Sequence, residues 1–170
     1  MTQPTRAHLA VLGLGANLGD PVVALREAIA TLRAHPQTAD WRVSPFYRTA
    51  PIGSDETQPD YVNAVAVCHT DLPPETMMQW LLDTECHFGR DRSHDAARNA
   101  PRTLDLDLLI YDDVTLQTPL LTLPHPRLHE RAFVLYPLLD LLPDITLPGL
   151  GRLDRYLPKV ADQAIDRLPA

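Results

Sequence analysis

The chain has 170 residues, 45% hydrophobic and 22% charged, and these values are ordinary for one globular domain. Its formal net charge of −7 argues against a nucleic-acid binder, which would carry a basic surface. The sequence contains no run of about eighteen apolar residues, so we expect no membrane span. The N-terminus lacks the apolar centre of a signal peptide, and Cys68 and Cys86 show neither a disulfide framework nor zinc spacing. We therefore expect a single monomeric domain over residues 1–170, in the reducing cytoplasm, with neither nucleic acid nor membrane as partner.

The first half of the chain alternates between the hydrophobic periods of strands and helices. Pro21 can open a helix at its first position, and the glycines just before it suggest a turn that uses their backbone freedom. In chain order we expect a strand at 9–14, a turn at 15–20, a helix at 21–34, a strand at 41–47, a loop at 49–60, a strand at 61–70 and a helix from 73 to 88.

The second half begins with a polar loop and becomes increasingly apolar. We expect a loop at 90–101, a strand at 103–111, short strands at 114–117 and 120–123, a mainly helical segment at 126–141 despite Pro137, and short packed pieces from 143 to 170, with a helical turn at 153–157. The order strand, helix, strand, strand, helix, strand resembles the split β-α-β pattern. It predicts a mainly antiparallel sheet with helices on one face and two long loops beside one site.

The strand at 103–111 carries Asp105 and Asp107 two residues apart, so both carboxylates project from the same face. Leucines 104, 106 and 108 then point to the opposite face, toward a core. The nearest cations are arginines at 90, 92, 98 and 102. Carboxylates suit Mg²⁺ and arginines suit phosphate oxygens, so the segment predicts a magnesium-bound polyphosphate. The simplest alternative is a solvated strand face beside a solvated loop.

Other motifs fail on spacing. The glycines at 13, 15 and 19 miss the dinucleotide fingerprint, because Leu18 stands where its third glycine belongs. Lys159 is the only lysine, so neither a phosphate loop nor a protein-kinase lysine is present. His125 and His129 lack the pattern of a zinc helix.

Three further residues have ordinary structural explanations when the local sequence is considered alone. Arg131 is equally a helix-surface residue, and Tyr61 and Phe133 are ordinary core aromatics.

Five separate blocks, spread in order from about residue 9 to 141, make the chain resemble the 6-hydroxymethyl-7,8-dihydropterin pyrophosphokinase family of folate biosynthesis. They are Gly15-Ala16-Asn17-Leu18, Phe46-Tyr47-Arg48-Thr49-Ala50-Pro51, Gln58-Pro59-Asp60-Tyr61-Val62-Asn63-Ala64, Arg98-x-Ala100-Pro101-Arg102-x-x-Asp105-x-Asp107, and Pro124-His125 with Arg131-x-Phe133. The chain departs from the family pattern in a longer arginine loop, in Ala16 where serine is more usual, and in Asn99 and Pro126 where aromatics are common.

The resemblance implies a ferredoxin-like α+β fold and transfer of pyrophosphate from ATP to the hydroxymethyl group of the pterin, with release of AMP. It implies that Asp105 and Asp107 hold two Mg²⁺ ions, and that Arg90, Arg92, Arg98 and Arg102 grip the triphosphate. Glu85, Leu108 and His125 align with adenosine-side contacts, and Arg131 with the nucleotide site. The pterin side would comprise Thr49, Ile52, Tyr61, Asn63 and Phe133, with the two aromatic rings stacked on the pterin.

Two other functions remain open from the residues alone. A non-catalytic relative would retain the pterin or nucleotide site without transfer. A different two-metal phosphotransferase or nuclease would use the same carboxylate pair, although the acidic net charge disfavours a nuclease.

Overall fold

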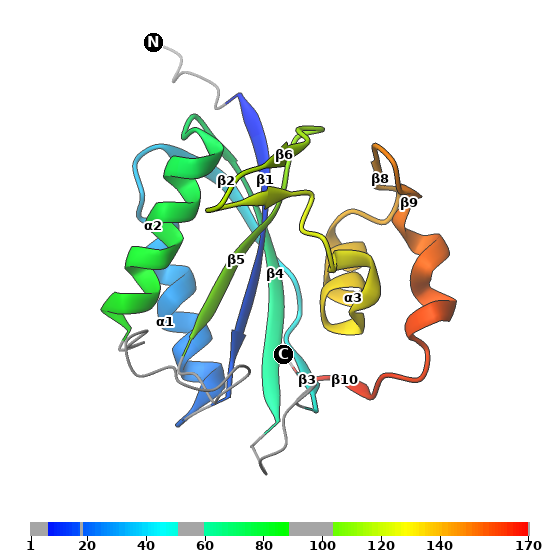
Figure 1. Cartoon of the computed structure of the whole chain (residues 1–170). Coiled ribbons are helices and arrows are strands. Elements are labelled where there is room, and N and C mark those ends of the chain that lie inside the picture. The colour runs from blue at the N-terminus through cyan, green and yellow to red at the C-terminus, as the bar shows by residue number, and fades with distance from the viewer. Residues whose placement is uncertain (1–6, 18, 51–59, 89–103, 170) are drawn as a thin grey trace.

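The computed structural model describes residues 7–17, 19–50, 60–88 and 104–169 (Figure 1). Within them, the central element is a six-stranded sheet in the order β10-β3-β4-β1-β5, with β2 also paired to β4. Every pairing in it is antiparallel. The strands are β1 (His8–Ala16), β2 (Thr38–Val43), β3 (Tyr47–Thr49), β4 (Tyr61–Thr70), β5 (Asp105–Tyr111) and β10 (Ile165–Arg167). This confirms the predicted ferredoxin-like antiparallel sheet.

Helices cover both faces of the sheet, so the expectation of helices on one face was wrong. On one face lie α1 (Pro21–Arg33) and α2 (Pro74–His87); on the other lie α3 (Ala132–Leu141) and the 3-10 helix η3 (Leu153–Val160) (Figure 1). The reason is the apolar chain after β5, since α3 buries Val134, Leu135 and Leu138 in a second core with Val11 and Val65 of the sheet.

Shorter elements follow β5 in the chain. They are the strand pair β6 (Leu116–Gln117) and β7 (Thr122–Leu123), the 3-10 helix η2 (Leu128–Glu130), and the strand pair β8 (Thr146–Leu147) and β9 (Gly151–Arg152). None of the helices described here combines the length and the apolarity needed to cross a membrane.

Two sequence expectations change in detail, and one is confirmed. The predicted strand at 41–47 is two strands, β2 and β3, which pair with different ends of β4. The predicted turn at 15–20 is shorter, because β1 continues through Gly15 to Ala16. Helix α1 begins at Pro21 as predicted, and the carboxylate of Asp20 caps it by accepting a hydrogen bond from the Val23 N–H.

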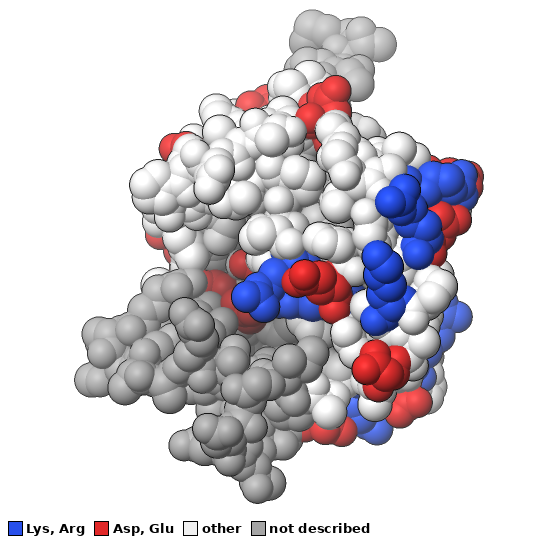
Figure 2. All heavy atoms as spheres, turned by 45° about the vertical axis from the view of Figure 1, so that its right-hand side comes forward, with Lys and Arg blue, Asp and Glu red and all other residues white. Residues whose placement is uncertain are grey.

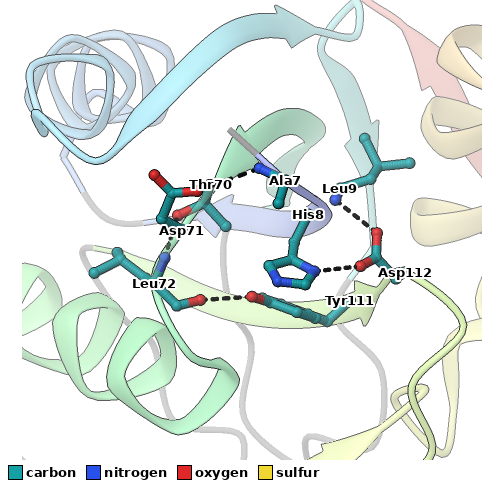
Figure 3. Close-up of polar contacts among 8 residues, drawn as sticks. All are labelled: Ala7, His8, Leu9, Thr70, Asp71, Leu72, Tyr111 and Asp112. Atoms are coloured by element: carbon teal, nitrogen blue, oxygen red, sulfur yellow. Dashed lines mark hydrogen bonds and ion pairs between the residues drawn. The ribbon is translucent and has the colours of Figure 1, made fainter. Parts of the chain in front are cut away.

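At the end of the sheet opposite Asp105 and Asp107, side chains fix the start of β1 against the end of β5 (Figure 3). Asp112 accepts a hydrogen bond from the Leu9 N–H at 2.7 Å and lies 2.6 Å from His8 Nδ1. The Tyr111 hydroxyl donates to the Leu72 carbonyl at 2.7 Å, which joins the segment after β4 to the same corner. These bonds hold the β1–β5 register that sets Asp105 and Asp107 at the opposite end.

Candidate active site

A row of paired residues crosses four strands at the end of the sheet that carries the aspartates. Asp105 of β5 pairs with Gly15 of β1, Gly15 pairs with Asn63 of β4, and Asn63 pairs with Tyr47 of β3. Directly paired residues share a face, so these positions lie on one side of the sheet. The neighbouring row brings Asp107 opposite Gly13 and, through it, Val65, which belongs to the α3 core. The aspartates therefore face the side of α3.

The alternation predicted for the aspartate strand is confirmed. Leu104, Leu106 and Leu108 are buried in the core formed with α1 and α2, while Asp105 and Asp107 are half-exposed. A rigid β5, buried on its other face, thus presents two carboxylates about 6–7 Å apart along the strand. Such a pair supplies oxygen ligands for Mg²⁺, which typically takes one or two protein carboxylates and completes its shell with phosphates and water.

Arg131 lies close enough to the aspartates to be affected by their charge. It immediately precedes α3, and its Cζ atom lies 5.4 Å from the Phe133 ring centroid. Burial lowers the pKa of Arg131, whereas the negative charge of Asp107 and then of Asp105 opposes that change. The guanidinium remains charged at neutral pH. Arg131 is therefore half-buried beside the two aspartates, and its role in the site stays a prediction.

His125 reaches the same region from the turn before η2. Its backbone N–H donates to the Leu109 carbonyl at 2.8 Å, and its Nδ1 accepts a hydrogen bond from the Arg127 N–H at 3.2 Å. Burial lowers the pKa of His125 to about 4, the Arg131 and Arg127 charges act the same way, and Asp105 opposes them. A neutral imidazole with its proton on Nε2 follows. The sequence reasoning did not single out Arg127, whose charge becomes relevant only once the fold brings it near.

Asn63 is held in one orientation in a space that Gly15 creates. Its Nδ2 donates to the Thr49 hydroxyl at 2.7 Å. A Cβ atom on Gly15 would lie 2.9 Å from Asn63 Oδ1, closer than real Cβ contacts allow. The glycine is thus needed for close approach inside a strand, not for the turn that the sequence suggested. Tyr61, half-exposed at the start of β4, pairs with Thr49 and completes this corner.

The outer edge of β5 gathers the residues predicted for the adenosine side. Glu85 of α2 is 0% exposed and accepts a hydrogen bond from the Leu106 N–H at 2.7 Å, while the Leu109 carbonyl on the same edge accepts from His125. Backbone groups alternate direction along the regular part of a strand, so those of Leu108 point to the same edge as those of Leu106. The register shift between the Leu12–Leu108 and Val11–Ile110 pairs makes Leu109 the extra residue of a bulge, which lets its carbonyl reach that edge as well. The Leu108 side chain lies in the core, so only its backbone can contact a ligand here.

Several predicted site residues cannot be placed. Arg90, Arg92, Arg98, Arg102 and Ile52 lie outside the described residues. In the parts of the chain that are described, no group of three or more His, Cys, Asp or Glu side chains is arranged to hold a metal. Figure 2 shows basic and acidic side chains gathered together across the face that α3 and η3 cover.

Comparison with known proteins agrees with the geometry. The sequence profile of the 7,8-dihydro-6-hydroxymethylpterin-pyrophosphokinase family matches residues 11–143. A 2-amino-4-hydroxy-6-hydroxymethyldihydropteridine pyrophosphokinase from Pseudomonas aeruginosa is 39% identical over 158 residues, covering 93% of this chain and 95% of that protein. One of the same name from Synechocystis is 40% identical over 149 residues, covering 88% of this chain and 74% of that protein.

Solved structures share the fold at much lower sequence identity. A Plasmodium falciparum HPPK-DHPS crystal structure with pterin and p-hydroxybenzoate aligns over 100% of this chain with a TM-score of 0.69 and 13% identity. An HPPK-DHPS crystal structure in complex with substrates gives a TM-score of 0.70 over 91% of this chain, again at 13% identity. The chain spans less than half of each of these two longer proteins, 46% and 43% respectively.

Proposed function

The chain belongs to the 7,8-dihydro-6-hydroxymethylpterin-pyrophosphokinase family, and we propose that the aspartate face of its sheet is the active site. It is a folate-biosynthesis enzyme that transfers pyrophosphate from ATP to 6-hydroxymethyl-7,8-dihydropterin and releases AMP. The observation that carries the site is the strand row that joins Asp105, through Gly15, to Asn63. It sets metal-type ligands and a buried amide on one face, separated by a residue without a side chain.

Asp105 and Asp107 would hold two Mg²⁺ ions between the protein and the ATP phosphates. The donor set fits, because Mg²⁺ in phosphoryl-transfer sites takes few protein carboxylates and several phosphate oxygens. When bound, the ions supply charge neutralisation at those oxygens. Arg131 would add a fixed positive charge beside them, and Arg90, Arg92, Arg98 and Arg102 would contact the triphosphate.

The pterin would bind over the Asn63 corner. The Asn63 amide, fixed by Thr49, offers the paired hydrogen-bond groups that a pterin edge requires. Tyr61 and Phe133 would stack on the pterin ring, with Ile52 contributing from the neighbouring segment. Phe133 already packs partly against the α3 core and carries Arg131 beside its ring, so its position is set before substrate arrives.

The adenosine would lie along the outer edge of β5. The backbone of Leu108 and the neutral imidazole of His125 provide hydrogen-bonding groups there without adding charge. Glu85 supports this edge through its bond to Leu106. The AMP leaving group would therefore remain at β5 while the terminal pyrophosphoryl group faces the pterin.

The reaction requires positioning more than a covalent nucleophile. A phosphoryl group in transfer carries charge spread over its oxygens, and catalysis comes mainly from aligned reactants and fixed countercharges. The aspartates on a buried strand and Arg131 at the start of a helix are rigid supports for these charges. The hydroxymethyl oxygen of the pterin is the attacking group.

Formation of AMP tests the function directly. MgATP with hydroxymethyldihydropterin should yield AMP, with no AMP when the pterin is omitted. Release of ADP would contradict pyrophosphoryl transfer, and binding of both ligands without AMP would indicate a non-catalytic relative.

The Asp107→Asn substitution tests the metal assignment. It keeps the side-chain size but removes the charge that a metal ligand supplies, so turnover should fall more than about a hundredfold while the circular dichroism spectrum is unchanged. Asp113→Asn, in the exposed turn just after β5, is the matched control and should retain full activity. Normal turnover of Asp107→Asn would remove the assignment.

The remaining parts of the proposal concern the whole chain. We place it in the cytoplasm, as one monomeric catalytic domain over residues 1–170. Free Cys68 and Cys86, the latter exposed, fit a reducing compartment. Sedimentation at several protein concentrations would test the monomer.

A further inference from the structure

Three side chains from separate elements meet beside β3. The Tyr47 hydroxyl of β3 donates a hydrogen bond to Asp140 near the end of α3. The other carboxylate oxygen of Asp140 lies 3.0 Å from the guanidinium of Arg167 in β10. The Arg167 Cζ atom also lies 5.8 Å from the Tyr47 ring centroid. We call Tyr47, Asp140 and Arg167 the β3 clamp.

The clamp acts on a strand that has little other support. β3 has three residues, and it pairs with β4 on one side and β10 on the other. β10 itself is equally short, and the Leu168 N–H beyond it donates to the Phe46 carbonyl at 2.8 Å. Strands of this length form only when other contacts hold them. β10 also lies beyond residues 11–143, which match the family profile, so the shared motifs do not account for it.

β3 in turn sets the position of Asn63. Tyr47 is the direct partner of Asn63 in the β3–β4 register, and Thr49 accepts the hydrogen bond from the Asn63 amide. The Asn63 amide fills the space over Gly15, where an added Cβ atom would lie 2.9 Å from Asn63 Oδ1. Since Gly15 has no side chain, the side-chain hydrogen bond that orients the amide comes from Thr49 of β3.

The clamp also joins both sides of the pterin region. Asp140 is on the same helix as Phe133, whose ring we place against the pterin, while Tyr47 and Thr49 belong to the strand beside Asn63. A hydrogen bond from Tyr47 to Asp140 thus couples the stacking residue to the amide. We propose that the β3 clamp positions the pterin half of the site, with Tyr47, Asp140 and Arg167 acting through Asn63, Thr49 and Phe133 rather than on the substrate itself. The choice of pterin as the ligand rests on the function proposed above.

Burial makes Tyr47 the central member. Arg167 is 57% exposed on its side chain, and an ion pair of that kind contributes little in water. Tyr47 is only 7% exposed, and its hydroxyl bonds to the carboxylate of Asp140 in a part-buried position. Burial and then Asp140 raise the pKa of Tyr47, which keeps the hydroxyl protonated and able to donate.

The Tyr47→Phe substitution removes the hydroxyl and leaves the ring. Amide hydrogen exchange at Thr49 and Tyr61, paired across β3 and β4, should become faster than in the wild type because β3 opens more often. If the competent arrangement is populated less, the pterin should bind about three- to tenfold more weakly, while a non-hydrolysable ATP analogue should keep its affinity. Arg167→Gln should act in the same direction, with a smaller effect.

Arg152→Gln is the matched control. Arg152 is also a C-terminal arginine with a half-exposed side chain, and it is paired with Asp144 at 3.1 Å and Asp154 at 2.9 Å. It contacts no residue of the clamp, so its loss should leave both exchange and pterin affinity unchanged. A general loss of stability would instead weaken both ligands or neither.

The possible results distinguish a failure of the clamp proposal from a failure of the proposed function. Unchanged exchange at Thr49 and Tyr61 in Tyr47→Phe would overturn the inference, as would equal pterin affinity of wild type and variant. Faster exchange with selectively weaker pterin binding would support it. If the wild type formed no AMP and bound no pterin, the proposed function would fail, and the pterin role of the clamp would fail with it, whatever the exchange data showed.

Discussion

At the scale of single residues, the Asn63 corner, where we propose that the pterin binds, depends on the Cβ atom that Gly15 lacks. Gly15 leaves room for the Asn63 amide, and Gly15→Ala would place a methyl group 2.9 Å from Asn63 Oδ1. We expect the amide to move, its hydrogen bond to Thr49 to break, and the free energy of unfolding to fall by about 1–3 kcal/mol. Denaturant unfolding measures the stability, and titration calorimetry should show weaker pterin binding.

Gly13→Ala is the control for this prediction. Gly13 lies two residues earlier on the same face of β1, but its added methyl group would meet the flexible side chain of Leu109 at 3.3 Å. We expect a smaller loss of stability and unchanged pterin affinity. Equal pterin binding by the two variants would contradict the role given to Gly15.

The lowered pKa of His125 predicts how the stability of the fold changes with pH. Its pKa is lowered from 6.5 to about 4 in the folded protein, mainly by burial. Between these two values the unfolded chain binds a proton that the native protein does not, so this residue destabilises the fold as pH falls from about 6.5 to about 4. The contribution is absent above that window.

His125→Gln removes the titration while keeping a neutral hydrogen-bonding side chain. We expect the stability of the variant to fall less steeply than that of the wild type between pH 6.5 and pH 4. Above pH 6.5 the two curves should have the same slope. Urea unfolding at a series of pH values measures both curves. Parallel curves throughout this range would show that His125 titrates normally.

At the scale of elements, the joint between α2 and β5 decides how firmly the aspartate strand is held. Glu85 is fully buried and accepts the hydrogen bond of the Leu106 N–H, one residue after Asp105. Glu85→Ala would leave that N–H without this acceptor and create a cavity, and we expect a loss of about 2–4 kcal/mol in the free energy of unfolding. Glu85→Gln retains an acceptor oxygen and should recover part of it in the same denaturant titration.

The pattern of hydrophobic residues along the sequence predicted the long elements. The strand at 61–70 was predicted with the bounds that β4 has, and the aspartate strand with its buried face. Periodicity did not predict β3 and β10, because three residues carry too little pattern and their pairing spans more than a hundred positions. Nor did it reveal why Gly15 is small, since the neighbour that requires it, Asn63, lies far away in the sequence.

For the candidate site, the sequence supplied residue types and the fold supplied distances. The sequence predicted the carboxylate pair of Asp105 and Asp107 directly, because two acidic residues in an apolar strand are unusual. That Arg131 lies near them depends on α3 packing on the same face, which the expectation of one helical layer missed. The roles of the arginines at 90, 92, 98 and 102 remain predictions.

At the scale of the whole molecule, one sheet serves two cores. β1 sends Leu12 to the core with α1 and α2, and Val11 to the core with α3 and η3; β4 likewise divides Ala66 and Val67 between them. Because the same strands form part of both cores, the loss of one core should disorder the strands on which the other core depends. We therefore expect the two faces to unfold in a single cooperative step.

The two tryptophans allow this to be tested, because both report from one face only. Trp41 and Trp80 pack against the core formed with α1 and α2, whereas Leu138 is fully buried in the core on the other side. In a cooperative molecule, Leu138→Ala should lower the free energy of unfolding followed by tryptophan fluorescence by about 2–5 kcal/mol, as much as circular dichroism shows. Leu81→Ala, in the core beside the tryptophans, is the comparison. A fluorescence transition that Leu138→Ala leaves in place, while circular dichroism shifts, would mean that the α3 layer unfolds on its own, and the site that it shares with β5 would then open without global unfolding.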